Sequence, residues 1–239
     1  MINYRGLDIL FTSFGAVTSD DLFCDKEQAL FDFYEANAKR YSKALDIGAN
    51  IGVHSLLMAR NGWSVRAFEP DPEHWRNLFT NIERNYATGI AVYNHALSDC
   101  SGEAQFVRVK GNLTANHLKG DKVPYGEFEE ITIDVRDCRS RFAWADFAKI
   151  DCEGGEARLL LTTTEETWEH LDAMVEVGNT KNADAIYRHL RGRVPMWAQR
   201  NAWRQVETLD DMPKHHSEQA LFIGHKPPFA ALQHLPEKV

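Results

Sequence analysis

The amino-acid sequence predicts an α/β fold, a doubly wound and mostly parallel sheet with a small antiparallel insertion between the third and fourth core strands. Short apolar segments alternate with segments of helical period along residues 43–95 and again from residue 147. This alternation is typical of parallel strands joined by crossover helices. Between these regions, residues 105–109 and 130–135 alternate apolar and polar side chains. Such a pattern predicts half-solvated antiparallel strands.

The expected elements can be placed along the chain from this periodicity. A first helical pattern at residues 25–41 is expected to cover one end of the sheet. The second crossover helix is expected to begin with Asp71 as its N-cap and Pro72 at the first helical position. The expected parallel strands are 43–47, 64–69, 90–95, 147–151 and 173–177, with final strands at 203–206 and 220–223.

Length and composition are those of one soluble globular domain. The net charge of −8 argues against nucleic-acid and membrane binding, because both need basic surface. Four widely spaced cysteines, and the lack of a signal-peptide or membrane-span pattern, predict a cytoplasmic chain with reduced thiols. Within the single domain 1–239, we expect an N-terminal arm and covering helix at 1–42, a core at 43–225 and a tail at 226–239.

The turn after the first strand indicates the class of ligand. Residues 46–52 read Asp-Ile-Gly-Ala-Asn-Ile-Gly, whereas a dinucleotide-binding turn has G-x-G-x-x-G facing a pyrophosphate. Asp46 occupies the first glycine position, and its charge would repel a pyrophosphate but attract an ammonium or a sulfonium. The turn therefore predicts a nucleoside ligand with a positive centre, which describes S-adenosylmethionine.

Acidic residues recur at the carboxyl ends of the expected strands, where a doubly wound sheet binds its ligands. Glu69 ends the second strand, at the spacing after Asp46 that is expected of an acid on a ribose diol, about 20 positions. Asp151 ends the fourth strand, Glu153 lies just past it, and Glu176 lies in the fifth. Carboxylates beside a core are costly unless they are paired, so these positions predict a cationic or hydroxyl-rich ligand.

Four segments together resemble the successive motifs of the FkbM-family S-adenosylmethionine-dependent methyltransferases. The resemblance covers about residues 43–225, and it is most specific in the K-I-D-x-E-G-x-E run that starts at Lys149. The four segments are 46–52, 68–70, 94–99 and 149–156.

This resemblance implies a class I methyltransferase fold, which is Rossmann-like, and methylation of hydroxyl groups on sugars or other small molecules. It implies that the glycine turn holds the methionine part of the cofactor and that Glu69 holds the ribose. Ala96 and Leu97 would flank the adenine, with Asp99 at its amino group. The implied cofactor-binding residues are Asp46, Gly48, Ala49, Asn50, Gly52, Glu69, Pro70, Ala96, Leu97 and Asp151.

Asp151 is the expected catalytic base, with Glu153 beside it, because transfer to a hydroxyl needs a group that accepts the proton. If the two carboxylates are close, repulsion would raise one pKa towards neutrality. His95 and His54 are alternative bases, since histidine titrates near neutral pH, and a packing role is the other interpretation of each. No metal is assigned, although Asp151, Glu153 and Glu176 offer oxygen ligands that suit magnesium.

Two further stretches and two other functions complete the predictions. The polar, glycine-punctuated residues 110–126 are expected to be a mobile loop that forms a lid over the substrate. The tryptophan-rich residues 196–203 fit a stacking surface and a buried strand turn equally well. The expected partner is a small-molecule or glycan acceptor. A dinucleotide-dependent oxidoreductase and a non-catalytic nucleoside-binding module stay open as alternatives.

Overall fold

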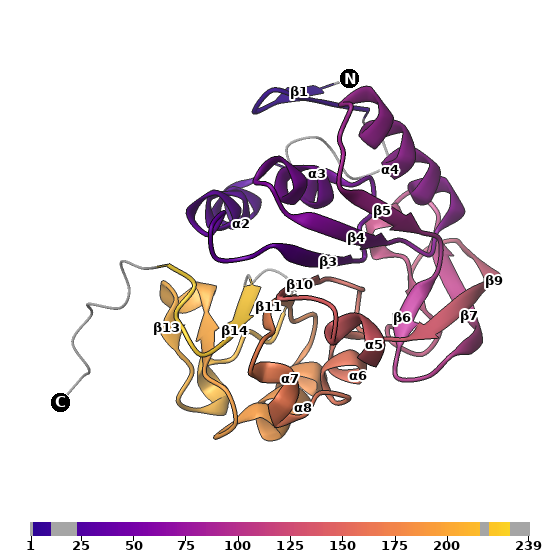
Figure 1. Cartoon of the computed structure of the whole chain (residues 1–239). Coiled ribbons are helices and arrows are strands. Elements are labelled where there is room, and N and C mark those ends of the chain that lie inside the picture. The colour runs from indigo at the N-terminus through magenta and orange to yellow at the C-terminus, as the bar shows by residue number, and fades with distance from the viewer. Residues whose placement is uncertain (1, 11–22, 216–219, 230–239) are drawn as a thin grey trace.

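A central sheet of eight strands organises the computed structural model, which describes residues 2–10, 23–215 and 220–229. Its strand order is β13-β12-β14-β11-β10-β3-β4-β5 (Figure 1). The strands are β3 (Lys43–Ile47), β4 (Ser64–Phe68), β5 (Ile90–Tyr93), β10 (Phe147–Ile150), β11 (Asp172–Glu176), β12 (Met196–Ala198), β13 (Arg204–Gln205) and β14 (Ala220–Ile223).

The five strands predicted to be parallel are parallel, as the pairings of β5, β4, β3, β10 and β11 show. In the register, Ile47 of β3 lies opposite both Phe68 of β4 and Ile150 of β10. The chain runs outward from β3 to β4 and β5, then returns to the other side of β3 as β10. This reversal makes the carboxyl ends of β3 and β10 the switch point where a doubly wound sheet binds its ligands.

Helices cover both faces of the sheet, which confirms the doubly wound α/β prediction (Figure 1). One buried cluster joins α2 and α3 to the sheet through Phe33, Leu56 and Phe147. The other joins α6, α7 and α8 to the opposite face through Leu159, Trp168 and Ile186. The helices are α2 (Asp25–Ala36), α3 (Val53–Arg60), α4 (Pro72–Arg84), α5 (Arg139–Phe142), α6 (Glu156–Leu160), α7 (Glu165–Trp168) and α8 (Thr180–Leu190).

The predicted starts of α2 and α4 are right, and the predicted end of α2 is wrong. Asp71 caps α4 by accepting hydrogen bonds from the N–H groups of Glu73 and His74, and Pro72 is its first residue. The first helix ends at Ala36, five residues before Tyr41. The Tyr41 ring packs instead on Phe147 and Trp63, with centroids 4.9 and 5.3 Å apart. Its apolar character therefore reflects core packing beneath the sheet rather than a longer helix.

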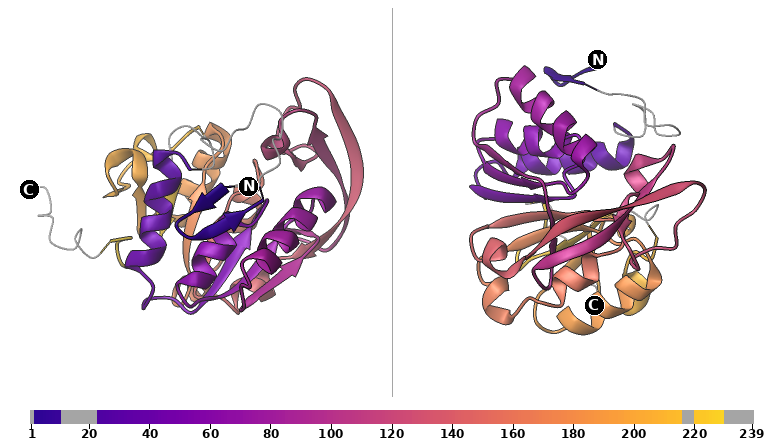
Figure 2. Two further views of the ribbon diagram at one scale, coloured as in Figure 1. Left: turned by 90° about the horizontal axis from the view of Figure 1, so that it is seen from above. Right: turned by 90° about the vertical axis from the view of Figure 1, so that its right-hand side faces the viewer.

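The predicted antiparallel insertion is a second sheet with the order β6-β9-β7-β8. Its long pair, β7 and β9, is antiparallel from Gly102 opposite Val135 to Val109 opposite Phe128. The short strand β6, which was not predicted, runs parallel to β9. Figures 1 and 2 show this sheet standing beside the carboxyl ends of β3 and β4. The strands are β6 (Ala96–Ser98), β7 (Gly102–Val109), β8 (His117–Leu118) and β9 (Phe128–Asp137).

The chain ends are partly ordered against the core. Residues 2–9, which carried no clear pattern, form a hairpin of β1 (Ile2–Tyr4) and β2 (Leu7–Ile9). Near the other end, Arg40 donates a hydrogen bond to the Pro227 carbonyl at 2.8 Å. The rest of the predicted arm and tail, at 11–22 and 230–239, lies outside the described residues. Among the helices that the structure describes, none has the length and apolar content of a membrane span.

The tryptophan-rich stretch is structural. Trp197 lies in β12 opposite Phe222 of β14 and packs against the core cluster beneath α2. Trp203 packs against the same cluster, with its ring 5.8 Å from that of Phe229. The buried-strand interpretation of residues 196–203 is therefore the one that this structure supports.

Candidate functional site

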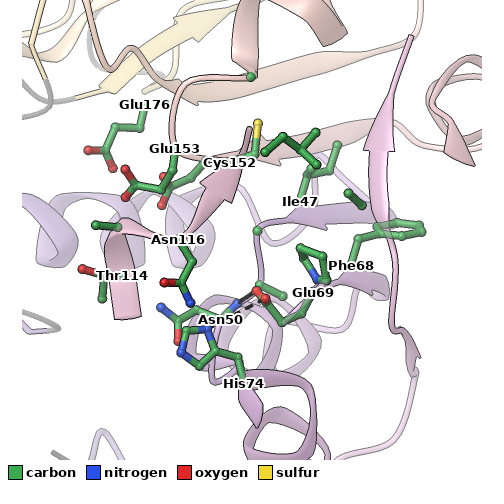
Figure 3. A pocket seen from close by; sticks show the side chains of 18 of the residues that line it. Ile47, Asn50, Phe68, Glu69, His74, Thr114, Asn116, Cys152, Glu153 and Glu176 are labelled. Carbon is green, nitrogen blue, oxygen red and sulfur yellow. Dashed lines mark hydrogen bonds and ion pairs between the residues drawn. The ribbon is translucent and has the colours of Figure 1, made fainter. Parts of the chain in front are cut away.

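A cavity of about 460 Å³ lies at the carboxyl ends of β3, β4 and β10. Its walls come from the glycine turn after β3, the Glu69–Pro70 segment after β4, the strand β6, the loop 110–126 and the residues that follow β10. Figure 3 shows Asn50 and Glu69 towards one end and Glu153 and Glu176 towards the other. The size is within the usual range for small-molecule and cofactor sites, about 300–1,000 Å³.

The glycine turn is held tightly between β4 and the loop after β10. The N–H groups of Gly48 and Ala49 both donate to the Phe68 carbonyl at 3.0 Å. A Cβ on Gly48 would lie only 1.8 Å from the Asp151 carbonyl oxygen, and its φ is +78°. Glycine at this position therefore lets the turn approach the Asp151 backbone. Ala49 and Asn50 line the cavity, whereas Gly52 packs against Leu78, away from it.

Glu69 is buried at the end of β4 and holds the glycine turn in place. Its Oε2 accepts a hydrogen bond from the Asn50 N–H, and its Oε1 accepts one from the Asp71 N–H, both at 2.8 Å. Burial raises the pKa of Glu69 to about 8, although these two donors act in the opposite direction. A carboxyl group has acceptor sites beyond these two, so Glu69 can also bind hydroxyl groups in the cavity that it lines with Pro70.

Asp46 does not face the cavity, so the electrostatic argument made from it needs correction. Its side chain is fully buried, and Oδ2 accepts a hydrogen bond from the Ser55 hydroxyl at 2.5 Å. Its Oδ1 lies 3.9 Å from the Lys149 ammonium. Because neighbouring side chains in a strand point to opposite faces, Ile47 lines the cavity and Asp46 lies behind it. Asp46 therefore supports the site from beneath.

The wall provided by β6 is apolar. Ala96 and Leu97 line the cavity together with Phe68 and Phe106, which makes a slot suited to a flat base. Asp99 lies outside the lining, and its Oδ1 accepts a hydrogen bond from the Ser98 hydroxyl at 3.0 Å. Ser98, not Asp99, is the polar group of this segment that reaches the cavity.

His95 also lies outside the lining of the cavity. Its ring packs against those of Phe68 and Tyr93, with centroids 5.4 and 5.7 Å away. Its Nδ1 lies 3.2 Å from the Ala96 carbonyl oxygen, and burial lowers the pKa of the imidazole. These contacts are those of a packing residue.

The opposite end of the cavity is acidic and contains one buried lysine. Lys149 is only 6% exposed and donates a hydrogen bond to Asp151 Oδ2 at 3.0 Å. Burial alone would lower the pKa of Lys149, but attraction to Asp151, Asp46 and Glu27 outweighs it and leaves that pKa raised. Lys149 therefore stays protonated and keeps the Asp151 carboxylate compensated.

Glu153 combines an unusual backbone with a shifted pKa. Its φ of 59° is in the left-handed region, which costs energy for a residue other than glycine. Burial and, secondly, the neighbouring Asp151 raise the pKa of Glu153 to about 7. The repulsion expected from the sequence is therefore present, although burial is the larger cause. Burial also raises the pKa of Glu176, with Asp151 and Glu153 adding to it.

The loop 110–126 folds over the cavity and is fastened by three contacts. Asn116 donates to Asp71 Oδ2 at 3.0 Å, Asp121 pairs with Arg158, and Lys122 pairs with Glu153. The loop also contains the short helix η1 (Leu113–Ala115) and the strand β8. Several of its residues line the cavity, and its role as a lid over the substrate stays a prediction.

His54 lines the cavity and is engaged on both ring nitrogens. The Tyr34 hydroxyl lies 2.8 Å from Nδ1, and Glu27 Oε2 lies 3.1 Å from Nε2. The roles of Glu27, Lys122 and Asn116 were missed in the sequence because each is far along the chain from the strand ends. Lys149 did carry a signal, since a lysine inside an apolar strand needs an acidic partner.

The magnesium alternative finds no support in the geometry. Across residues 2–10, 23–215 and 220–229, no three histidine, cysteine or acidic side chains converge in a way that could hold a metal ion. Asp151 is occupied by Lys149, and Glu153 is occupied by Lys122.

Comparison with known proteins identifies the family of this chain and finds solved structures with a similar fold. The methyltransferase FkbM domain matches residues 46–194 of this chain. The solved METTL16 methyltransferase domain is 16% identical, with a TM-score of 0.50, over 92% of this chain and 74% of that one. The human methyltransferase 10 domain containing protein is 14% identical, with a TM-score of 0.49, over 92% and 90%. At such identities, structural likeness shows the fold alone. No curated protein sequence matched.

Proposed function

The chain belongs to the FkbM methyltransferase family, and we propose that it transfers a methyl group from S-adenosylmethionine to a hydroxyl of a sugar or another small acceptor. The observation that carries this proposal is the distribution of polar and apolar groups along the cavity of about 460 Å³. Glu69 is suited to a diol at one end, an apolar slot lies beside it, and carboxylates gather at the other end. This order of groups matches a ribose, an adenine and a cationic sulfonium.

The residues present fit this cofactor. Glu69 keeps acceptor sites for the ribose hydroxyls after binding two backbone N–H groups. Ala96, Leu97 and Phe68 would hold the adenine between apolar surfaces. The turn at Ala49 and Asn50, held against β4, would hold the methionine part. When bound, S-adenosylmethionine supplies a methyl group on a positively charged sulfur.

Asp151 is the proposed base. It lies at the acidic end of the cavity, where its carboxylate is held by Lys149. Asp151 accepts the proton of the acceptor hydroxyl as the new C–O bond forms and the C–S bond breaks. Most of the rate acceleration then comes from holding the acceptor oxygen in line with the methyl carbon. The two histidines are less suited, since His54 is engaged on both nitrogens and His95 lies outside the lining.

Binding of a dinucleotide is disfavoured for a reason different from the one that the sequence suggested. Asp46 is turned away, so it would not meet a pyrophosphate directly. The two lysines at the acidic end of the cavity, Lys149 and Lys122, are already paired with Asp151 and Glu153, so neither is available to a second phosphate-bearing nucleotide. The acceptor class and the cytoplasmic location stay predictions.

The proposal is tested by methyl transfer from labelled S-adenosylmethionine to a panel of monosaccharides, glycosides and hydroxylated metabolites. We expect label to appear on an oxygen of at least one of them, and S-adenosylhomocysteine to be released in equal amount. Label on nitrogen or carbon alone would contradict the O-methyltransferase assignment.

A further inference from the structure

A second cavity, of about 230 Å³, adjoins the acidic end of the first. Four residues line both cavities, namely Glu27, Lys149, Asp151 and Glu176. The two spaces therefore meet at the carboxylate proposed to take the proton. The remaining walls of the second cavity come from the start of α2, from Ile150 and Met174, and from Gln199 and Ala220.

Much of this second cavity is built from residues outside the matched family segment. The FkbM domain covers residues 46–194, whereas Cys24, Glu27, Leu30, Gln199 and Ala220 lie before or after it. The groups on the cofactor side, such as Glu69 and Asp151, lie within the segment. These flanking elements are not part of the matched family domain. A cavity that they line is therefore where this chain would determine which acceptor it binds.

Two side chains, Tyr34 and His54, position Glu27 where the two cavities meet. Burial raises the pKa of Tyr34, so its hydroxyl stays protonated and can donate to His54 Nδ1 at 2.8 Å. His54 Nε2 in turn lies 3.1 Å from Glu27 Oε2, a buried oxygen that accepts no hydrogen bond from the described residues. One carboxylate oxygen of Glu27 is therefore directed at the imidazole, and the other, Oε1, is left for a ligand.

We propose that the second cavity is the acceptor pocket and that Glu27 is its acceptor-binding residue, taking hydrogen bonds from hydroxyls next to the one that is methylated. The inference rests on the proposed function and deepens it by naming the pocket and the size of the acceptor. At about 230 Å³ the cavity is smaller than a site for a drug-sized ligand. It admits one sugar ring or a comparable small polyol, and a longer glycan would have to extend out of it.

The lining combines apolar surface with hydrogen-bond acceptors, and a sugar ring needs both to bind. Leu30 and Met174 provide its apolar wall, whereas the side chain of Ile150 packs into the core cluster on the opposite face of the sheet. Glu27, Asp151 and Glu176 offer oxygen acceptors for the hydroxyls of the ring. Gln199 is already engaged, since its Oε1 accepts from the Ala220 N–H at 3.0 Å, so it shapes the wall and leaves recognition to the carboxylates.

Cysteine alkylation provides a test that does not depend on turnover. Cys24 lines the second cavity, and Cys100 is exposed elsewhere as an internal reference. The full chain, saturated with S-adenosylhomocysteine, is treated with iodoacetamide in the presence of glucose, mannose, galactose or rhamnose, and both sites are read by mass spectrometry. We expect at least one sugar to slow alkylation of Cys24 several-fold and to leave Cys100 unchanged.

The same alkylation measurement on the Glu27→Gln variant tests whether Glu27 binds the acceptor. We expect this variant to lose the protection of Cys24 and to show a KM for the protecting sugar that is at least tenfold higher, with kcat within a few-fold of the parent. Glu35→Gln, on the exposed face of the same helix, is the matched control and should behave as the parent does.

Separate outcomes overturn the inference and the proposed function. If no sugar protects Cys24, or if Glu27→Gln is protected as well as the parent, the pocket assignment is wrong even where methyl transfer is observed. If S-adenosylhomocysteine does not bind by calorimetry, the proposed function itself fails. Retained binding of S-adenosylhomocysteine by Glu27→Gln shows that the variant is folded, so a loss of protection is not a loss of structure.

Discussion

Lys149 and Asp151 form an ion pair on the last residues of one strand and its loop, with 3.0 Å between Nζ and Oδ2. The lysine is almost completely buried, and both residues line the two cavities where they meet. This arrangement holds the Asp151 carboxylate in one orientation at the place where the two spaces meet. It also leaves a second carboxylate oxygen, Oδ1, for a proton from the acceptor.

The first prediction concerns Asp151. Asp151→Asn keeps the size of the side chain and removes its ability to take a proton, so we expect kcat to fall by about 10²–10⁴-fold. Binding of S-adenosylhomocysteine by calorimetry should change little. Asp134→Asn, on the exposed strand β9, is the control. An unchanged kcat on a true acceptor would show that another group is the base.

The second prediction concerns Glu69. Glu69→Gln keeps one oxygen acceptor and replaces the other by an amide nitrogen, so one of the N–H groups of Asn50 and Asp71 loses its partner. A buried donor without a partner costs about 1–3 kcal/mol, so we expect the affinity for S-adenosylhomocysteine to fall about 10- to 100-fold. Glu83→Gln, exposed on α4, should bind as the parent does. Equal affinities of the two variants would remove Glu69 from the cofactor site.

The third prediction concerns pH and stability. The pKa values of Glu69 and Glu153 are about 8 and about 7 in the folded protein, against an ordinary value of 4.5. Between these values the folded state binds protons that the unfolded state has lost, so stability must fall as pH rises. We expect the urea midpoint of the ligand-free protein to be lower at about pH 8.5 than at about pH 5.5. Glu69→Gln should reduce the slope, and a midpoint that rises over this range would refute the assignment.

The fourth prediction concerns the close approach at Gly48. Gly48→Ala would place a methyl group against the Asp151 carbonyl in a backbone conformation with φ of +78°. The left-handed conformation alone costs about 1–2 kcal/mol, and the contact forces the turn away from β10. We expect a lowered Tm and loss of S-adenosylhomocysteine binding. Gly178→Ala meets no heavy atom within 4 Å and should be tolerated. Normal binding by Gly48→Ala would show that the turn is not part of the site.

The fifth prediction separates a supporting role for Asp46 from a binding role. Asp46→Ala removes the acceptor for Ser55 and one of the carboxylates that compensate Lys149. Breaking a buried charge pair costs about 3–5 kcal/mol, so we expect a large loss of unfolding free energy in urea. If the variant were as stable as the parent but bound the cofactor more weakly, Asp46 would have a binding role rather than a supporting one.

Much of the fold follows from the periodicity of the sequence. Strands covered on both faces are apolar throughout, which is why β3, β4, β10 and β11 could be placed. The strand β6 was missed, and β12 was left open between two interpretations, because each has only three residues, too few to show a period. The hairpin of β1 and β2 was missed for the same reason.

The site was predictable where a residue's spacing determines its place. Glu69 ends a strand at the interval that a ribose-binding acid requires, so its position could be inferred. The orientation of Asp46 could not, because the sequence of a doubly covered strand does not tell which face opens onto a cavity. Glu27, Asn116 and Lys122 reach the site from distant elements, and only the packing of α2 and the loop over the sheet brings them there.

Calorimetric titration with S-adenosylhomocysteine and, separately, with NAD tests the central claim most directly. The account predicts saturable binding of S-adenosylhomocysteine that Glu69→Gln weakens, and no binding of NAD at comparable concentration. Tight binding of NAD with no response to S-adenosylhomocysteine would contradict it.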